Sequence, residues 1–257
     1  MRTTHSNRLS PPANETVRDL LSRVPPRHRQ CQAMQRLTRA ITGDHEPGSS
    51  AQLPPLTDLS EFDLYLMGIA ELKQGNDEQV VRCLNAAIQR GRETGQPPRF
   101  WAYFQRAYCF DRLGRTEQAI ADYGTCIGLR SNFTWPHHNL GLIHARRGEH
   151  EQAAQHFRDA LACDPELGPS YINLGAAQCG LGRFAEADDS FSRAIDNGHL
   201  TAKLLAKALA NRSAARAALG NQDDALADAK RAIEIDPSCE TARRNLELLG
   251  GVTHGPH

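Results

Sequence analysis

Residues 148–194 read GEHEQAAQHFRDALACDPELGPSYINLGAAQCGLGRFAEADDSFSRA and decide the fold, because their residue types recur at a fixed distance. Gly148 and Gly182 lie 34 residues apart, and Gly114 precedes Gly148 by the same distance. Each glycine is followed by a small residue, an aromatic residue and another small residue: Ala119, Tyr123, Cys126; Ala153, Phe157, Ala160; Ala187, Phe191, Ala194. A 34-residue period of this kind predicts stacked helix-turn-helix units rather than one catalytic domain.

The same pattern continues around Gly75 and Gly220, at distances of 39 and 38 residues from their neighbours, which gives about five units. The extra residues on the N-terminal side, RETGQPP at 92–98, contain one Gly and two Pro and predict a lengthened loop. Those on the C-terminal side fall in 200–219, an uninterrupted run of strong helix formers. They predict a first helix that is longer by about one turn.

The Leu-Gly pairs at 140–141 and 174–175, the small-aromatic-small pattern, and Pro165 and Pro237 at the ends of units resemble the tetratricopeptide repeat family. The resemblance covers residues 58–239. It departs at Arg92, Ser131 and His199, which stand where the family's closing proline would be. The resemblance implies an all-α fold, a right-handed superhelical solenoid of antiparallel helix pairs whose first helices line a concave groove. Such grooves hold an extended peptide or a partner's helix.

The chain divides into four parts on this interpretation. Residues 1–57 form a basic N-terminal segment with one or two short helices and a flexible linker, 58–239 the array, 240–249 a capping helix and 250–257 a disordered tail. Two placements of residues 1–57 stay open. They dock on the first repeat, or they occupy the groove of their own chain.

Each first helix carries two stripes. In the third unit His137, Leu140, Gly141 and His144 share one face and are expected to pack on the second helix. The other stripe would face the groove, where exposed aromatic side chains indicate a contact surface. The candidate groove residues are Trp101, Phe104, Gln105, Tyr108, Arg112, Trp135, His138, Asn139, Arg146, Asn173, Lys207 and Asn211.

Asn139, Asn173 and Asn211 occupy the same place in three consecutive units. An Asn side chain both donates and accepts hydrogen bonds, so this series could hold a peptide backbone without reading its side chains. The alternative is that each Asn is merely tolerated on a helix surface.

The family resemblance suggests a sharper function, a co-chaperone that binds the acidic C-terminus of a partner of the Hsp70 or Hsp90 type. Asn173 and Lys207 match that carboxylate clamp, whereas His138, Leu142 and Asn211 replace its other ligands. A third possibility is a regulatory partner of a bacterial signalling kinase, because similar arrays occur fused to such kinases.

Catalysis, a metal site and a cofactor are not expected. His137 and His144 share a helix face, but seven residues separate them by roughly 10 Å along the axis, and no acid or Cys is expected to complete a ligand set. The sequence contains no phosphate-binding Gly-rich loop, serine elbow or kinase motif. These observations favour a non-catalytic adaptor.

Charge and cysteine content limit the partners and the compartment. With 30 basic and 30 acidic residues, the formal net charge is zero, so no nucleic-acid partner is expected. Seven cysteines without a C-x-x-C spacing favour a reducing, cytoplasmic location. No apolar run approaches the length of a membrane span. A protein or peptide is the partner expected, of unknown identity.

Overall fold

The computed structural model describes residues 59–97 and 99–252, with side chains as far as Gly250. The helices and linker predicted within residues 1–57 lie outside this range. The chain divides into two compact units, Met1–Ser131 and Asn132–His257. All regular structure in the described residues is helical, and none of these helices is long and apolar enough to cross a membrane.

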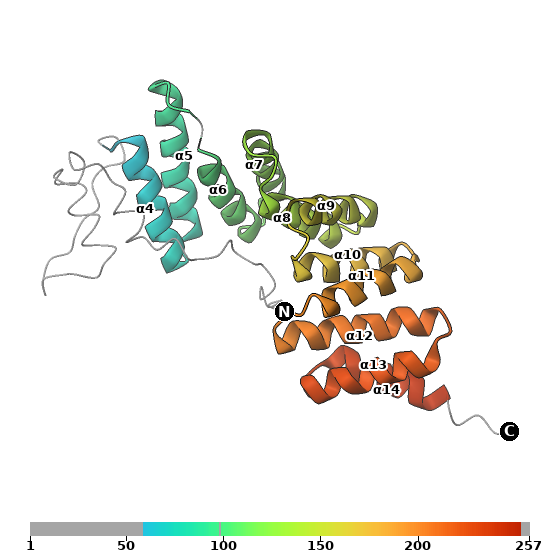
Figure 1. The fold of residues 1–257 in the computed structure, drawn as a ribbon. Helices are drawn as coiled ribbons and strands as arrows, with labels where there is room; N and C mark the ends of the chain where they lie inside the picture. Colours follow the sequence, from blue (N-terminus) through green and yellow to red (C-terminus); the bar gives the residue numbers. More distant parts are fainter. Residues whose placement is uncertain (1–58, 98, 253–257) are drawn as a thin grey trace, which may run out of the picture. The chain divides into compact units, whose positions relative to one another are not determined.

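The helices form consecutive pairs in both units (Figure 1). The first unit contains α4 (Glu61–Gln74), α5 (Asp77–Glu93), α6 (Phe100–Arg112) and α7 (Thr116–Leu129). The second contains α8 (Thr134–Arg146), α9 (His150–Cys163), α10 (Gly168–Gly180), α11 (Phe184–Asp196), α12 (Ala202–Ala218), α13 (Gln222–Ile235) and α14 (Glu240–Val252). Within each unit, the second helix of one pair packs on the first helix of the next. The all-α array of helix pairs predicted from the sequence is confirmed.

The recurring glycines set the turn inside each pair. Gly148 and Gly182 have φ angles of 74° and 72°, in the left-handed region. A residue with a Cβ is strained there, whereas glycine is not. The backbone N–H of the next residue then bonds back into the ending helix, as Glu149 does to the carbonyl of His144 (3.0 Å). This requirement explains why glycine recurs at the turn of each repeat.

The core of each pair is built from the small and aromatic residues of the repeat. Phe157 on α9 and Phe191 on α11 are fully buried. A Cβ built on Gly141 would lie 2.6 Å from Cε1 of Phe157, and one on Gly175 would lie 2.7 Å from Cε1 of Phe191. The aromatic rings of Phe157 and Phe191 thus fill the space beside the two glycines. The glycines therefore allow the ring to lie against the helix backbone.

The two insertions are accommodated mainly by helix. α12 has 17 residues, which confirms the prediction of a lengthened first helix. α5 also has 17 residues and runs through Glu93, so the predicted loop at 92–98 is shorter than expected. The reason is that Gly91 and Arg92 continue the helix, and the left-handed turn comes only at Gly95.

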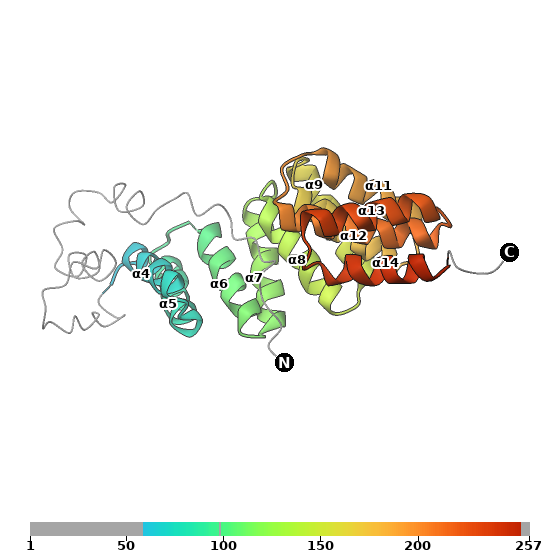
Figure 2. The ribbon, with the colours of Figure 1, turned by 90° about the horizontal axis from the view of Figure 1, so that it is seen from below.

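The C-terminal helix α14 packs on both α12 and α13, as both views show (Figures 1 and 2). Ala242 and Leu249 are buried, and the Asn245 amide donates to the carbonyl of Ala210 (2.8 Å). The helix extends three residues beyond the predicted end at 249, because Gly250 and Gly251 follow a buried Leu249 without ending it. A tail could begin only after Val252, beyond the described residues.

Candidate functional site

The predicted groove residues divide between the two units. Those on α6 belong to the first unit, and those on α8, α10 and α12 belong to the second. Their burial depends on their distance from the turn glycine. The residue ten positions before it is buried in all five repeats: Tyr65, Phe104, His138, Ile172 and Ala210. Phe104 and His138, predicted to be exposed, are thus core residues in the structure.

His138 is buried because the next helix pair covers it. Its Nδ1 atom lies 2.7 Å from the Ser170 hydroxyl on α10, and its ring packs edge-on against Phe157 on α9 (centroids 5.7 Å apart). The sequence periodicity places His138 outside the stripe of α8 that packs on α9, but it does not show that α10 covers His138. Burial lowers the pKa of His138 to about 4, so the imidazole is neutral at pH 7.

Three first helices of the second unit carry equivalent pairs of residues spaced four apart, which share a helix face. The pairs are Trp135 and Asn139 on α8, Pro169 and Asn173 on α10, and Lys207 and Asn211 on α12. α10 contacts both α8 and α12, so the pairs lie on neighbouring helices. Asn139 is buried, whereas Trp135, Asn173, Lys207 and Asn211 are half-buried. Burial lowers the pKa of Lys207. Arg146 is exposed near the end of α8.

The predicted aromatic surface on α6 is less exposed than expected. Trp101 packs edge-on against Phe104 (6.0 Å), which in turn contacts Tyr123 on α7 (5.8 Å). Trp101, Gln105 and Tyr108 are half-buried. Arg112 lies over the Tyr108 ring (5.7 Å) and pairs with Asp77 on α5 (3.0 Å). Neither tryptophan nor Tyr108 is among the large apolar side chains that the described residues leave exposed, because neighbouring side chains cover part of each.

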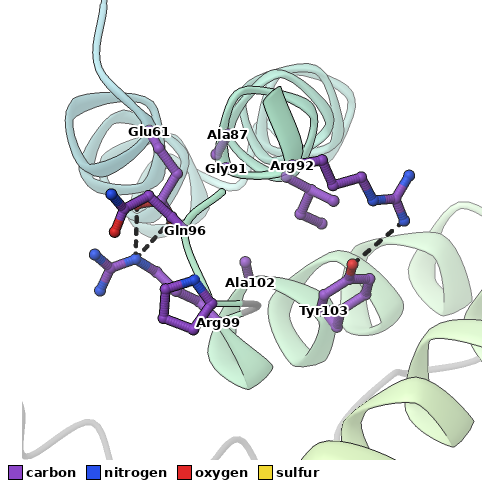
Figure 3. Close-up of a pocket in the computed structure, with 10 residues that line it drawn as sticks. Glu61, Ala87, Gly91, Arg92, Gln96, Arg99, Ala102 and Tyr103 are labelled. Carbon is purple, nitrogen blue, oxygen red and sulfur yellow. Dashed lines mark hydrogen bonds and ion pairs between the residues drawn. The ribbon is translucent and has the colours of Figure 1, made fainter. Parts of the chain in front are cut away.

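A small pocket lies within the first unit, between the start of α4, the end of α5 and the start of α6 (Figure 3). The Arg99 Nε atom donates to both carboxylate oxygens of Glu61 (2.6 and 2.8 Å) on one side. On the other side Arg92 donates to the Tyr103 hydroxyl (3.4 Å). The charged groups at its edge are therefore already paired within the chain.

Two equivalent Arg-Asp pairs connect the first helix of a repeat to its second helix. Arg106 donates twice to Asp122 (2.7 and 2.7 Å), and Arg212 donates twice to Asp228 (2.8 and 2.8 Å). Both carboxylates are buried. Periodicity alone did not identify these pairs, although the 16-residue spacing common to both is a signal that would have found them.

A second polar cluster lies between α8 and α9. His137 on α8 and His156 and Asp159 on α9 each offer one ligand atom, and these atoms all lie within 4.8 Å of one another. The His144 ring stacks on the His156 ring (5.2 Å, 12°), and His144 Nδ1 bonds to the Glu149 carboxylate (2.5 Å). We expected no ligand set here from the spacing along one helix. Asp159 and His156 on the second helix supply what α8 alone lacks.

Comparisons with known proteins identify the repeat. Models of the tetratricopeptide repeat match residues 102–133, 136–167 and 206–239. A tetratricopeptide repeat protein from Parabacteroides merdae superposes with a TM-score of 0.64 at 16% identity, over 75% of this chain and 73% of that one. MamA from Desulfovibrio magneticus gives 0.59 at 15% identity, over 69% and 95%. Both similarities concern the fold.

Curated relatives match parts of the array. The mouse (Mus musculus) FK506-binding protein-like is 34% identical over 119 residues, which is 42% of this chain and 33% of that protein. A tetratricopeptide repeat and J domain-containing co-chaperone, DNJ1 of Fusarium oxysporum, is 26% identical over 121 residues, or 47% and 22%. The chain therefore spans a third or less of the length of these relatives. The repeat matches, the turn glycines and the helix pairs agree, and the chain contains tetratricopeptide repeats.

Proposed function

We propose that the chain is a non-catalytic adaptor that binds an extended peptide or a partner's helix across α8, α10 and α12. The observation that carries this proposal is the row of equivalent residue pairs on these three neighbouring helices. Asn173 and Asn211 are half-buried and keep part of their surface open to solvent. Trp135 adds an aromatic side chain at one end of the row, and Lys207 adds a cation at the other.

The chemistry of the row suits backbone recognition. Each Asn amide can donate to a peptide carbonyl and accept from a peptide N–H, each such bond contributing about 1 kcal/mol. Phe104 and His138, ten positions before the turn glycine, are buried, so the proposed surface depends on the residues thirteen and nine positions before it, of which Asn139 is also buried. Asn139 would support it from beneath. The α6 residues Trp101, Gln105, Tyr108 and Arg112 and the exposed Arg146 remain proposed contacts of the same kind.

A reducing cytoplasm forms part of the proposal. Six described cysteines are free, and burial raises the pKa of Cys83 to about 11 and that of Cys126 to about 12. A thiol that stays protonated is a poor nucleophile. These cysteines therefore suit a packing role, which fits an adaptor.

The test is selection of linear peptides from a random display library, followed by calorimetric titration of an enriched peptide. Two lost hydrogen bonds amount to about 2 kcal/mol, so Asn173→Ala/Asn211→Ala should weaken binding roughly thirtyfold. Asn221→Ala, at an exposed turn residue, is the matched control and should bind as the wild type does. Equal binding by all three proteins would place the contact surface elsewhere.

Recognition of an acidic C-terminus is a second candidate, favoured by half-buried Lys207 beside Asn211 and by the similarity to a co-chaperone. Its test compares an acidic peptide that ends in a free carboxylate with the same peptide amidated. If the protein recognises an acidic C-terminus, it should bind the free acid more tightly than the amidated peptide, and this difference should disappear in Lys207→Ala. Equal affinity for both peptides would exclude the clamp and leave the backbone-binding proposal standing.

A further inference from the structure

His137, His156 and Asp159 occupy positions of the repeat at which the other repeats have residues of different types. The residue eleven positions before the turn glycine is Tyr103, His137, Tyr171 or Leu209. The residue eleven positions after it is Thr125, Asp159, Arg193 or Arg231. Packing of a helix pair therefore requires neither an imidazole nor a carboxylate at these positions. Among the units compared, α8 and α9 alone combine two histidines with an acid.

The two imidazoles direct unused ring nitrogens at the same carboxylate. Nδ1 of His137 lies 3.8 Å from Oδ2 of Asp159, and Nδ1 of His156 lies 4.0 Å from it. Both distances are too long for hydrogen bonds. Both nitrogens are shielded from solvent and find no hydrogen-bond partner in the described structure. A buried acceptor without a partner is costly, which makes a ligand between these atoms favourable.

We propose that His137, His156 and Asp159 bind a divalent transition-metal ion of the zinc type and so connect α8 to α9. Ligand atoms about 2.0–2.2 Å from a tetrahedral zinc lie about 3.4 Å apart. Asp159 Oδ2 lies 3.8 and 4.0 Å from the two nitrogens, and all three ligand atoms lie within 4.8 Å of one another, so closing on an ion requires side-chain shifts of at most about 1.4 Å. Two nitrogen ligands select such ions over magnesium and calcium, which prefer oxygen.

The surroundings suit a bound ion. Gln155 donates to Oδ1 of Asp159 (2.9 Å), which orients the carboxylate and leaves Oδ2 for the ion. The Asp159 side chain is 37% exposed, which gives the ion a route from solvent and a place for a water ligand.

The experiment uses the untagged full chain after treatment with a chelator, titrated calorimetrically with Zn²⁺ and followed by visible absorption with Co²⁺. We expect one strongly bound ion and a cobalt spectrum typical of nitrogen and oxygen ligands. Asp159→Asn and His156→Asn should each weaken this binding at least about tenfold. His199→Asn, at an exposed histidine between α11 and α12, is the matched control and should leave zinc binding unchanged. Mg²⁺ should not compete.

A readout on the unaltered protein keeps the test independent of how the variants fold. Imidazole NMR signals of His137 and His156 should shift with the first equivalent of Zn²⁺, while the signal of His199 stays in place. A cobalt spectrum dominated by thiolate charge transfer would overturn the proposal, because it would place the ion on cysteine. Undiminished affinity in Asp159→Asn, or unshifted His137 and His156 signals, would overturn it as well.

Discussion

The helix pairs α6–α7 and α8–α9 use the same repeat positions for different chemistry. In α6–α7, Arg106 forms a doubly hydrogen-bonded ion pair with Asp122 across the seam. In α8–α9 the equivalent residues are Leu140 and His156, and the polar contacts move to His137, His144 and Asp159. Both pairs keep a small residue on the first helix near an aromatic ring on the second: Ala107 with Tyr123, and Gly141 with Phe157.

The difference separates what the fold requires from what it permits. The turn glycine and the small-aromatic-small pattern recur because the backbone turn and the close approach of the helices depend on them. The polar residues beside them differ from pair to pair, because a seam can be completed by an ion pair, by apolar contact or by histidines. The histidine seam is therefore the part of this array that packing does not explain.

The largest expected effect is the loss of one partner from the ion pair of α6–α7. Asp122→Ala leaves the Arg106 guanidinium, 15% exposed, without its carboxylate. Removing one member of a buried pair strands the other charge, so the free energy of unfolding should fall by about 3 kcal/mol. Urea denaturation followed by far-ultraviolet circular dichroism measures this loss. Hydrogen bonding from Arg106 to Asn85 (2.6 Å) limits it.

The matched control replaces both charged residues with the residues found at the equivalent positions of α4 and α5. Met67 and Cys83 occupy the positions of Arg106 and Asp122 there, and both are buried. Arg106→Met/Asp122→Cys removes both charges together and should cost less than about 1.5 kcal/mol. If the double variant is as unstable as Asp122→Ala, the ion pair is required by the fold, and the distinction between required and permitted positions fails.

Acid should distinguish the two pairs next, because Phe104 in α6 and His138 in α8 occupy equivalent buried positions. The pKa of His138 is about 4 in the folded chain and about 6.5 when unfolded, so the unfolded state binds more protons between these values. The stability contributed by neutral His138 is complete above pH 6.5 and is lost as the pH falls to 4. The loss amounts to about 3 kcal/mol.

The variant that tests this is His138→Phe/Ser170→Ala, which copies the residue of α6 and removes the hydroxyl that would lose its partner. Urea denaturation of both proteins at pH 7, 5.5 and 4.5 gives the difference in their pH dependence. Other titrating groups, His156 among them, are common to both and cancel. Identical pH slopes would mean that folding does not lower the pKa of His138.

Much of the fold could be predicted from the sequence, because recurring residues report recurring geometry. The turn glycines, the helix pairs and the long α12 follow from a 34-residue period and helix propensity. The exposure of Phe104 and His138 could not be predicted, because periodicity within one helix does not tell whether solvent or the next pair covers a face. The His137, His156 and Asp159 cluster was missed for a related reason. Its members come from two helices, and only alignment of the units with one another reveals them.

Gly141→Ala examines the small-residue position. Alanine is favoured over glycine in a helix by about 0.5–1 kcal/mol, but its Cβ would lie 2.6 Å from the Phe157 ring. The overpacking should outweigh the propensity and reduce stability by about 1–3 kcal/mol. The double variant Gly141→Ala/Phe157→Leu copies the leucine that α5 has at Leu84. Its loss of stability should be smaller than the sum of the losses in the two single variants. A stabilised Gly141→Ala would show that the ring position is not set by glycine.

The smallest expected effect has the opposite sign and comes from Gly124, in the middle of α7. A Cβ there meets nothing within 4 Å, and the equivalent position in α9 holds Arg158, so the repeat accepts a side chain at this place. Gly124→Ala should therefore raise stability by about 0.5–1 kcal/mol, through the lower conformational entropy of the unfolded chain. Thermal unfolding measures the increase. The two glycine substitutions share one chemical change and differ in what the new methyl group meets, so opposite signs would attribute the cost at Gly141 to Phe157 alone.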